Sequence, residues 1–377
     1  MIITNIEVDG LPRHDKPIKA KLNSDLNIVT GRNGAGKTTL LKLLWYIISG
    51  NIEHAVREVP FTRASVTTDQ YSITITKSVS NEVRIEFHKN GERTLFTDDD
   101  DDDIFETSSA VDRANDAIKD IGSSLFFPTF RRIEGGFSVG QNQPNFGLRI
   151  PSRAKNELED AMLALSRRLT VEKHSFVAAI STVDIVTLLM RQYTEMSEAS
   201  NDLQKFTSHQ IIDQIKNYKE DSSFEFVGKS KADKVIDNIK TMIEAMDGQR
   251  AKILAPLDAV KNLVEKLFHH SGIKLGTRLS FGDAATAVSS DKLSAGEKQM
   301  LSFICYNAFY NNSVIFIDEP ELSLHVDWQR QLFPTLREQK SSNQFVVATH
   351  SPFIYSKYPD KEILMSEDRG AEGNEID

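Results

Sequence analysis

The sequence contains a single cysteine, Cys305, among its 377 residues. One cysteine can form neither an intrachain disulfide nor a C-x-x-C metal or redox motif, so we expect a protein of the reducing cytosol. Long apolar stretches are missing too, because no segment reaches the roughly 18 apolar residues that a transmembrane helix needs. The N-terminus, MIITNIEVDG, has neither the basic start nor the apolar core of a signal peptide. We therefore expect a cytoplasmic protein without a membrane partner.

Basic residues are fewer than acidic ones. The chain has 45 lysines and arginines against 54 aspartates and glutamates, which gives a net charge of −9. This balance disfavours a generally basic nucleic-acid surface, although a local basic patch would be compatible with it. Part of the acidic charge is an uninterrupted aspartate run at residues 98–103. Such a run is typical of a solvated loop, and the alternative is a docking or autoinhibitory segment for a basic partner.

Alternating strand and helix patterns occupy the two ends of the chain. Residues 1–150 contain short alternating apolar stretches, a glycine-rich turn before an apolar helix, and the hairpin signal Asn90-Gly91. Residues 273–377 contain two further apolar strands that end in polar residues. We predict an α/β fold in which these segments form an N-terminal lobe, with an inserted antiparallel β-region, and a C-terminal lobe.

The middle of the chain, residues 151–272, has a helical pattern. Two long helices are predicted at about 182–219 and 229–269, and we expect them to form an antiparallel, coiled-coil-like arm. Gly248 and Pro256 should interrupt the second helix, because both residues disfavour a helix interior.

GRNGAGKT, at residues 31–38, fits the pattern G-x-x-x-x-G-K-S/T, with a predicted strand before it and a helix after it. Glycines allow backbone amides to curl around phosphates, and the helix points its N-terminus at them. Lys37 should reach the β- and γ-phosphates of ATP, and the Thr38 hydroxyl should bind Mg²⁺. The candidate nucleotide-binding residues of this P-loop are Gly31, Asn33, Gly34, Ala35, Gly36, Lys37, Thr38 and Thr39.

VIFIDEPE, at residues 314–321, is an apolar strand that ends in carboxylates. Asp318 is placed to hold Mg²⁺, directly or through water, and Glu319 is the candidate base that polarises the attacking water. The alternative is that both carboxylates cap the next helix, with Pro320 in its first turn. His350 ends the next predicted strand, which would place it beside the γ-phosphate, although a histidine at a strand end can also be purely structural.

LSAGE, at residues 293–297, has the pattern of a helix start, with Ser294 as N-cap and Glu297 completing a capping box. The P-loop, LSxGE, the apolar strand with Asp-Glu and the strand-end histidine, in this order, resemble the ABC ATPase superfamily. The resemblance implies a P-loop NTPase head and two heads that sandwich two ATP molecules. It implies that Ser294 and Gly296 contact the γ-phosphate bound by the other head, as suits a helix N-terminus, and that ELSLH, residues 321–325, crosses the interface.

Two further features follow from the resemblance. The family places a γ-phosphate-sensing glutamine in the first lobe, and Gln141 and Gln143 are candidates by position. FFPTFRRIEGG is similar to an arginine-bearing strand of such proteins, so Arg131 and Arg132 could lie near the nucleotide or a basic partner groove. The alternative for these arginines is a surface ion pair.

The long helical insertion between the P-loop and LSAGE is similar to that of the SMC, RecF and RecN group and of the OLD-like defence ATPases. It is too short for an SMC protein, and the stretch after His350 is too short for the TOPRIM nuclease of OLD nucleases. The chain thus resembles the stand-alone ATPase subunits of anti-phage systems such as PARIS and Septu. We expect an ATP-dependent homodimer or higher homo-oligomer that controls a separate effector protein, a nuclease or toxin. One alternative is a RecF-like or SMC-like DNA repair or recombination ATPase. A transporter head is the other, and the long separation between the P-loop and LSAGE disfavours it.

Overall fold

The computed structural model describes residues 1–78, 82–98, 108–129, 132–133, 161–162, 164–180, 182–221, 229–268 and 294–366. The chain divides into two compact units. The unit called the head here comprises Met1–Ser181, Leu293–Phe303 and Tyr310–Asp377, and the arm comprises Thr182–Lys292 and Ile304–Phe309. Residues 99–103 of the aspartate run, Arg131, Gln141 and Gln143 lie outside the described ranges, so the expectations for them stay predictions.

A six-stranded parallel sheet forms the centre of the head, with strand order β10-β8-β12-β13-β3-β14. Every residue of the inner strands β8, β12, β13 and β3 is buried, as expected for a parallel sheet covered on both faces. Because the strands are parallel, their carboxyl ends meet at one edge, where ligands bind in open α/β sheets. The strands are β3 (Leu26–Thr30), β8 (Ser124–Phe127), β10 (His174–Phe176), β12 (Val314–Asp318), β13 (Gln344–Ala348) and β14 (Glu362–Leu364).

The head also contains a six-stranded antiparallel sheet with the order β2-β1-β4-β5-β6-β7. Buried residues alternate with more exposed ones along β4, β5 and β6, so one face packs inward and the other faces solvent. The predicted hairpin is confirmed, because Asn90 and Gly91 join β6 to β7 with φ angles of 54° and 84°. The strands are β1 (Ile3–Asp9), β2 (Ile18–Lys21), β4 (Arg63–Thr68), β5 (Ser72–Lys77), β6 (Val83–Lys89) and β7 (Glu92–Phe96).

Helix α1 (Lys37–Ile48) contacts β8, β12 and β13 of the parallel sheet and β4 of the antiparallel sheet. A helix that packs on several sides must be apolar nearly all round. Trp45 meets this requirement, with its ring centroid 5.5 Å from that of Phe126 and 5.4 Å from that of Phe176. The buried apolar residues of α1 are Leu40, Leu41, Leu43, Leu44, Trp45, Tyr46, Ile47 and Ile48.

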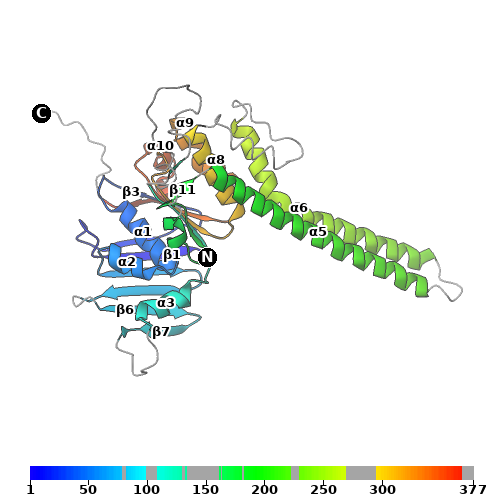
Figure 1. Ribbon diagram of the computed structural model, residues 1–377, viewed down its shortest axis with the longest axis horizontal. Helices are drawn as coiled ribbons and strands as arrows, with labels where there is room; N and C mark the ends of the chain where they lie inside the picture. The colour runs from blue at the N-terminus through cyan, green and yellow to red at the C-terminus, as the bar shows by residue number, and fades with distance from the viewer. Residues whose placement is uncertain are drawn as a thin grey trace, which may run out of the picture. The chain divides into compact units, whose positions relative to one another are not determined.

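Several further helices and one small strand pair accompany the two six-stranded sheets and α1. Helix α3 packs on β6 and β7 at the outer part of the antiparallel sheet (Figure 1). A two-stranded parallel pair joins β9 to β11. Helix α8 starts in the head and ends in the arm. The bounds are α2 (Ile52–Glu58), α3 (Ala110–Ile118), β9 (Arg132–Ile133), β11 (Ala179–Ile180), α8 (Ala295–Phe309), α9 (Val326–Glu338), α10 (Pro352–Tyr355) and η3 (Pro359–Lys361).

The arm is built from two long helices, α5 (Thr182–Asp221) and α6 (Lys229–Phe268), which pack side by side (Figure 1). The two predicted helices are therefore confirmed. The expected interruption of the second helix is wrong, since α6 runs through both Gly248 and Pro256. Packing along a partner helix supplies most of the stability of a helix in a protein, and it outweighs these two local penalties. Within the described ranges, no helix is long and apolar enough to serve as a membrane span.

A buried histidine in the head core makes stability depend on pH. His174 of β10 is fully buried, and its Nδ1 lies 2.8 Å from the Ser124 hydroxyl of β8. Burial lowers the pKa of His174 to about 4. An exposed histidine in the unfolded chain titrates near 6.5, so at intermediate pH the unfolded chain binds a proton that the folded head does not. The stabilising contribution is complete above about pH 6.5 and is lost as the pH falls towards 4.

We expect this one residue to lower the free energy of unfolding by about 2 kcal/mol between roughly pH 7.5 and pH 5. His174→Gln keeps a polar side chain but cannot titrate, so its free energy of unfolding should fall less over the same range. Urea denaturation at the two pH values measures the difference, with His88→Gln on the exposed face of β6 as the control. An identical pH dependence in His174→Gln and the wild type would contradict this prediction.

Candidate active site

The loop between β3 and α1 is shaped by glycines. Gly34 and Gly36 have φ angles of 80° and 85°, a region that residues with a side chain rarely adopt. Helix α1 begins directly after Gly36, with no side-chain cap and no acidic residue in its first turn. Its N-terminal amides and dipole therefore suit an anion. Asn33 is exposed in this loop, and Thr39 is half-buried in the first turn of α1.

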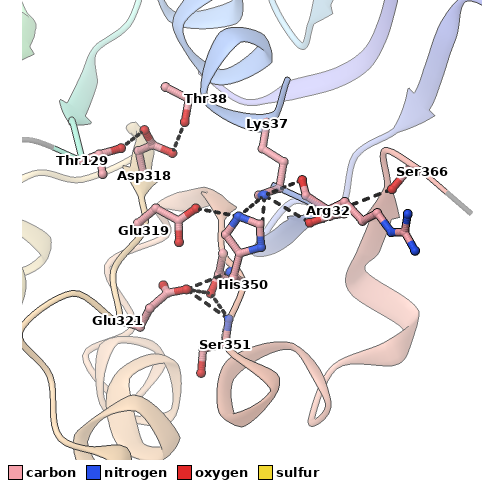
Figure 2. A network of polar contacts seen from close by, with 12 residues as sticks. Arg32, Lys37, Thr38, Thr129, Asp318, Glu319, Glu321, His350, Ser351 and Ser366 are labelled. Carbon is pink, nitrogen blue, oxygen red and sulfur yellow. Dashed lines mark hydrogen bonds and ion pairs between the residues drawn. The ribbon is translucent and has the colours of Figure 1, made fainter. Parts of the chain in front are cut away.

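Lys37 is held at the floor of this loop with only 4 % of its surface exposed. Its ammonium donates to the carbonyl oxygens of Gly31 at 3.2 Å and Arg32 at 3.4 Å, and it contacts the His350 ring (Figure 2). Burial lowers the pKa of Lys37, while the nearby carboxylates, Glu319 first among them, oppose that shift. The lysine is thus held by its own loop at the edge of the sheet where β12 and β13 end.

Asp318, at the end of β12, is fully buried and joins three elements. Its Oδ1 accepts a hydrogen bond of 3.0 Å from the Thr38 hydroxyl, at the start of α1. Its Oδ2 accepts one from the Thr129 hydroxyl, just after β8 (Figure 2). The carboxylate therefore lies beside the P-loop, and its predicted role in holding Mg²⁺ stays a prediction.

These oxygen atoms fit a magnesium ion. Magnesium in phosphate sites is held by one or two protein oxygens together with phosphate oxygens, so it needs no cage made of protein alone. The described residues contain no group of three or more histidine, cysteine, aspartate or glutamate side chains able to hold a metal. Thr38 and Asp318 are the residues suited to this ion.

Glu319 and His350 face each other across the ends of two neighbouring strands. Glu319 has a φ of 48°, and its amide donates 2.9 Å to the Ala348 carbonyl of β13, which turns its side chain towards the site. Its Oε1 lies 3.3 Å from His350 Nε2 (Figure 2). Burial raises the pKa of Glu319 to about 8, Glu321 adds to this increase and Lys37 opposes it. Burial, followed by the Lys37 charge, lowers the pKa of His350.

A carboxyl group that titrates near neutral pH can both hold and release a proton, which general acid–base chemistry requires. Glu319 has this property because it is buried beside a second carboxylate. Its position at the strand end, next to Lys37 and His350, is where the sequence placed the candidate base. The geometry is thus suited to proton transfer beside an anion bound at the P-loop.

The start of α8 is organised differently. The amide of Ser294 donates 2.8 Å to the Glu297 carboxylate, and the amide of Glu297 donates 3.3 Å to the Ser294 hydroxyl, which confirms the predicted capping box. A Cβ added to Gly296 would lie 2.5 Å from the Ser323 carbonyl oxygen, so close packing requires glycine there. In the described part of the chain, the hydrogen bonds of Ser294 stay within α8 and its N-terminal turn. The head thus gathers Lys37 with the strand-end residues, but not with Ser294.

Three residues at this site were not singled out from the sequence. Arg13 and His14, in the loop between β1 and β2, lie 3.2 Å and 2.8 Å from the carbonyl oxygens of Gly34 and Ala35. No local pattern indicates that this loop reaches the P-loop. Thr129 could have been found, because it is the first hydroxyl after a buried strand of the same sheet.

The chain is similar to two retron ATPases. It is 34% identical over 76 residues to the Retron Ec83 probable ATPase of Escherichia coli, covering 17% of this chain and 14% of that protein. It is 24% identical over 168 residues to the Retron Vc95 probable ATPase of Vibrio cholerae serotype O1 biovar El Tor, covering 41% of this chain and 28% of that protein. The matched stretches thus span well under a third of the length of these relatives.

A solved structure that the chain resembles is the Smc head domain with an extended coiled coil bound to the C-terminal domain of ScpA, derived from Pyrococcus furiosus. The TM-score is 0.39 at 13% identity, over 94% of this chain and 91% of that chain. The family description that matches the sequence is AAA ATPase domain, over residues 1–355. This range includes the P-loop and the strand ends that carry Asp318, Glu319 and His350. The chain therefore belongs to the AAA ATPase domain family.

Proposed function

We propose that the protein hydrolyses ATP, that two heads close on ATP, and that this cycle regulates a separate effector protein, a nuclease or toxin, in anti-phage defence. The observation that carries the proposal is the convergence of Lys37 with Asp318, Glu319 and His350 at one edge of the parallel sheet. Membership of the AAA ATPase domain family and similarity to two probable ATPases support hydrolysis.

Binding of ATP would use the P-loop as an anion cradle. The amides at the start of α1 face the phosphates, and Lys37 exchanges the carbonyl oxygens of Gly31 and Arg32 for phosphate oxygens, which are stronger acceptors. Thr38 and Asp318 would hold Mg²⁺, which when bound neutralises phosphate charge.

In hydrolysis, Glu319 in its carboxylate form takes a proton from water as the water oxygen bonds to the γ-phosphorus. The bond between the γ-phosphorus and the bridging oxygen breaks, and ADP and phosphate leave. His350 lies beside the Glu319 carboxyl and contacts Lys37, so it is suited to orient the transferred group. These proposed roles are supported by the contacts of His350 with both Glu319 and Lys37 and by the raised pKa of Glu319.

The second head would supply the start of α8. Ser294 is exposed, and its hydroxyl and the helix N-terminus suit an anion, while among the described residues its hydrogen bonds stay in the α8 turn. The residues of α8 divide between the two units, Ala295–Phe303 in the head and Ile304–Phe309 in the arm. A change at Ser294 is proposed to pass to the partner protein along this helix.

The effector is proposed to meet the arm. The arm exposes large apolar side chains, with Phe206 at 61% and Ile236 at 62% exposed, and apolar surface of this kind favours protein partners. The acidic net charge weighs against nucleic acid as the main ligand. Binding to DNA that weakens steeply with salt would instead favour a repair or recombination ATPase.

Lys37→Ala should lower kcat/KM for ATP at least about 100-fold, because it removes the charged donor to the phosphates. Lys42→Ala, on the same helix but outside the P-loop, serves as the control and should retain most activity. Steady-state phosphate release measures both variants. Normal turnover in Lys37→Ala would exclude the P-loop assignment.

Ser294→Arg should leave ATP binding by a single head intact and block ATP-driven dimerisation and hydrolysis. Mixing it with Lys37→Ala should restore activity, because a mixed dimer has one site with both an intact P-loop and an intact α8 turn. Random pairing predicts recovery of about a quarter of the wild-type rate. The readout is ATPase activity of the mixture against each variant alone. No recovery, although mixed dimers form, would count against action in trans.

Glu319→Gln should bind ATP and hydrolyse it about 100- to 1,000-fold more slowly, because the amide cannot take the proton from water. Closed dimers should then accumulate with ATP on a sizing column, whereas Glu53→Gln, on the exposed surface of α2, should behave as the wild type. Turnover at the wild-type rate would assign the base to another residue.

Glu319→Gln also tests whether the ATP cycle regulates a separate effector protein. With ATP, Glu319→Gln should form closed dimers and Lys37→Ala should not. An effector regulated by the ATP cycle should therefore bind the two variants unequally. Co-purification from the native host, followed by identification of the bound protein, reads this out. A nuclease or toxin that binds in one state supports the proposal, and equal recovery of the same proteins with both variants contradicts it.

A further inference from the structure

One oxygen atom of Glu321 accepts three hydrogen bonds from consecutive residues. Its Oε1 lies 2.7 Å from the Thr349 hydroxyl, 2.7 Å from the amide nitrogen of His350 and 3.0 Å from the amide nitrogen of Ser351. Figure 2 shows the Glu321 carboxylate pointing at the backbone of this turn. Three donors from consecutive residues converge on this one oxygen atom, so Glu321 fixes the conformation of the turn after β13.

The turn that Glu321 holds carries His350 into the site. The His350 ring contacts the Lys37 ammonium, and its Nε2 lies 3.3 Å from the Glu319 carboxylate. Glu319 and Glu321 belong to the same loop after β12. By binding the turn after β13, Glu321 therefore ties the loop that carries the proposed base to the turn that carries His350.

Helix α8 holds the same loop from another side. Gly296 packs so closely that an added Cβ would lie 2.5 Å from the Ser323 carbonyl oxygen. One turn further along, the side-chain amide of Gln299 donates 3.0 Å to the Pro320 carbonyl oxygen, and Gln299 is fully buried. The loop between β12 and α9 therefore contacts the start of α8 on one side. On the other side it contacts the His350 turn through Glu321.

We infer that Glu321 is a positioning residue for ATP hydrolysis, which holds His350 against Lys37 and Glu319 and links that end of the site to the start of α8. The inference rests on the proposed ATPase function. A purely structural role, as an anchor for the short helix α10, would lower stability without changing turnover in the folded protein. A positioning role therefore predicts a lower kcat that depends on His350, whereas a purely structural role predicts an unchanged kcat.

Glu321→Ala removes the acceptor, whereas Glu321→Gln keeps a carbonyl oxygen where the three donors point. We expect kcat of Glu321→Ala to fall roughly 100-fold through misplacement of reacting groups, with KM for ATP within about twofold of the wild type. Glu321→Gln should recover most of the lost kcat. Glu338→Ala, at an exposed position of α9, is the matched control. Wild-type kcat in Glu321→Ala, or a Glu321→Gln as slow as Glu321→Ala, would overturn the inference.

A double-mutant cycle with His350→Ala tests the route of action. If Glu321 acts through His350, then Glu321→Ala should cost little further kcat in the His350→Ala background. Fully additive losses would overturn the inference. Additive losses would mean that Glu321 affects kcat independently of His350, so the cycle separates positioning of His350 from any other effect of the substitution.

The outcomes for Glu321 and for the proposed function are distinct. A wild-type protein without ATP turnover would overturn the function itself, whereas an active wild type with an equally active Glu321→Ala would overturn the role of Glu321. Hydrogen exchange of the backbone amides of His350 and Ser351, which donate to Glu321, reports the anchor without any turnover. Exchange should accelerate in Glu321→Ala and stay near the wild-type rate in Glu321→Gln, and unchanged exchange in Glu321→Ala would contradict the inference.

Discussion

The buried carboxylate of Asp318 is the constraint around which the head is arranged. A buried charge is tolerated only when hydrogen bonds or opposite charges replace its water. Here the hydroxyls of Thr38 and Thr129 do so, and they come from the start of α1 and the end of β8. The ends of β12 and β8 and the start of the helix must therefore meet at one point. Parallel strand order supplies that meeting point, and the P-loop and His350 lie at the same edge.

Helix α1 connects this edge to the rest of the core. It packs against both sheets, and the ring of Trp45 contacts Phe126 of β8 and Phe176 of β10. Such packing fixes the axis of α1, so its N-terminus faces the strand ends rather than solvent. The antiparallel sheet supports the site in a second way, since Arg13 and His14 in its first connecting loop contact carbonyl groups of the P-loop.

Local patterns predicted the features that depend on local chemistry. Glycines at 34 and 36 predicted the P-loop, Asn90-Gly91 predicted the hairpin, and apolar periodicity predicted both helices of the arm. Features that depend on tertiary approach were missed or wrong. No spacing in the sequence shows that Glu321 reaches the turn after β13, or that α6 runs through Pro256. The roles of Ser294 and Gly296 in trans stay predictions, because they concern a second copy of the chain.

Charge explains why such a site would need a second head. Three carboxylates, Asp318, Glu319 and Glu321, act on the ammonium of Lys37, and all three favour its charged form. The Asp318 carboxylate beside the P-loop would repel an entering triphosphate, so Lys37 alone is poorly matched to its charge. A magnesium ion at Thr38 and Asp318 would offset part of that repulsion, and the positive N-terminus of a partner α8 would offset more. If two heads close on ATP as proposed, a partner α8 would supply positive charge that a single head lacks at the terminal phosphate.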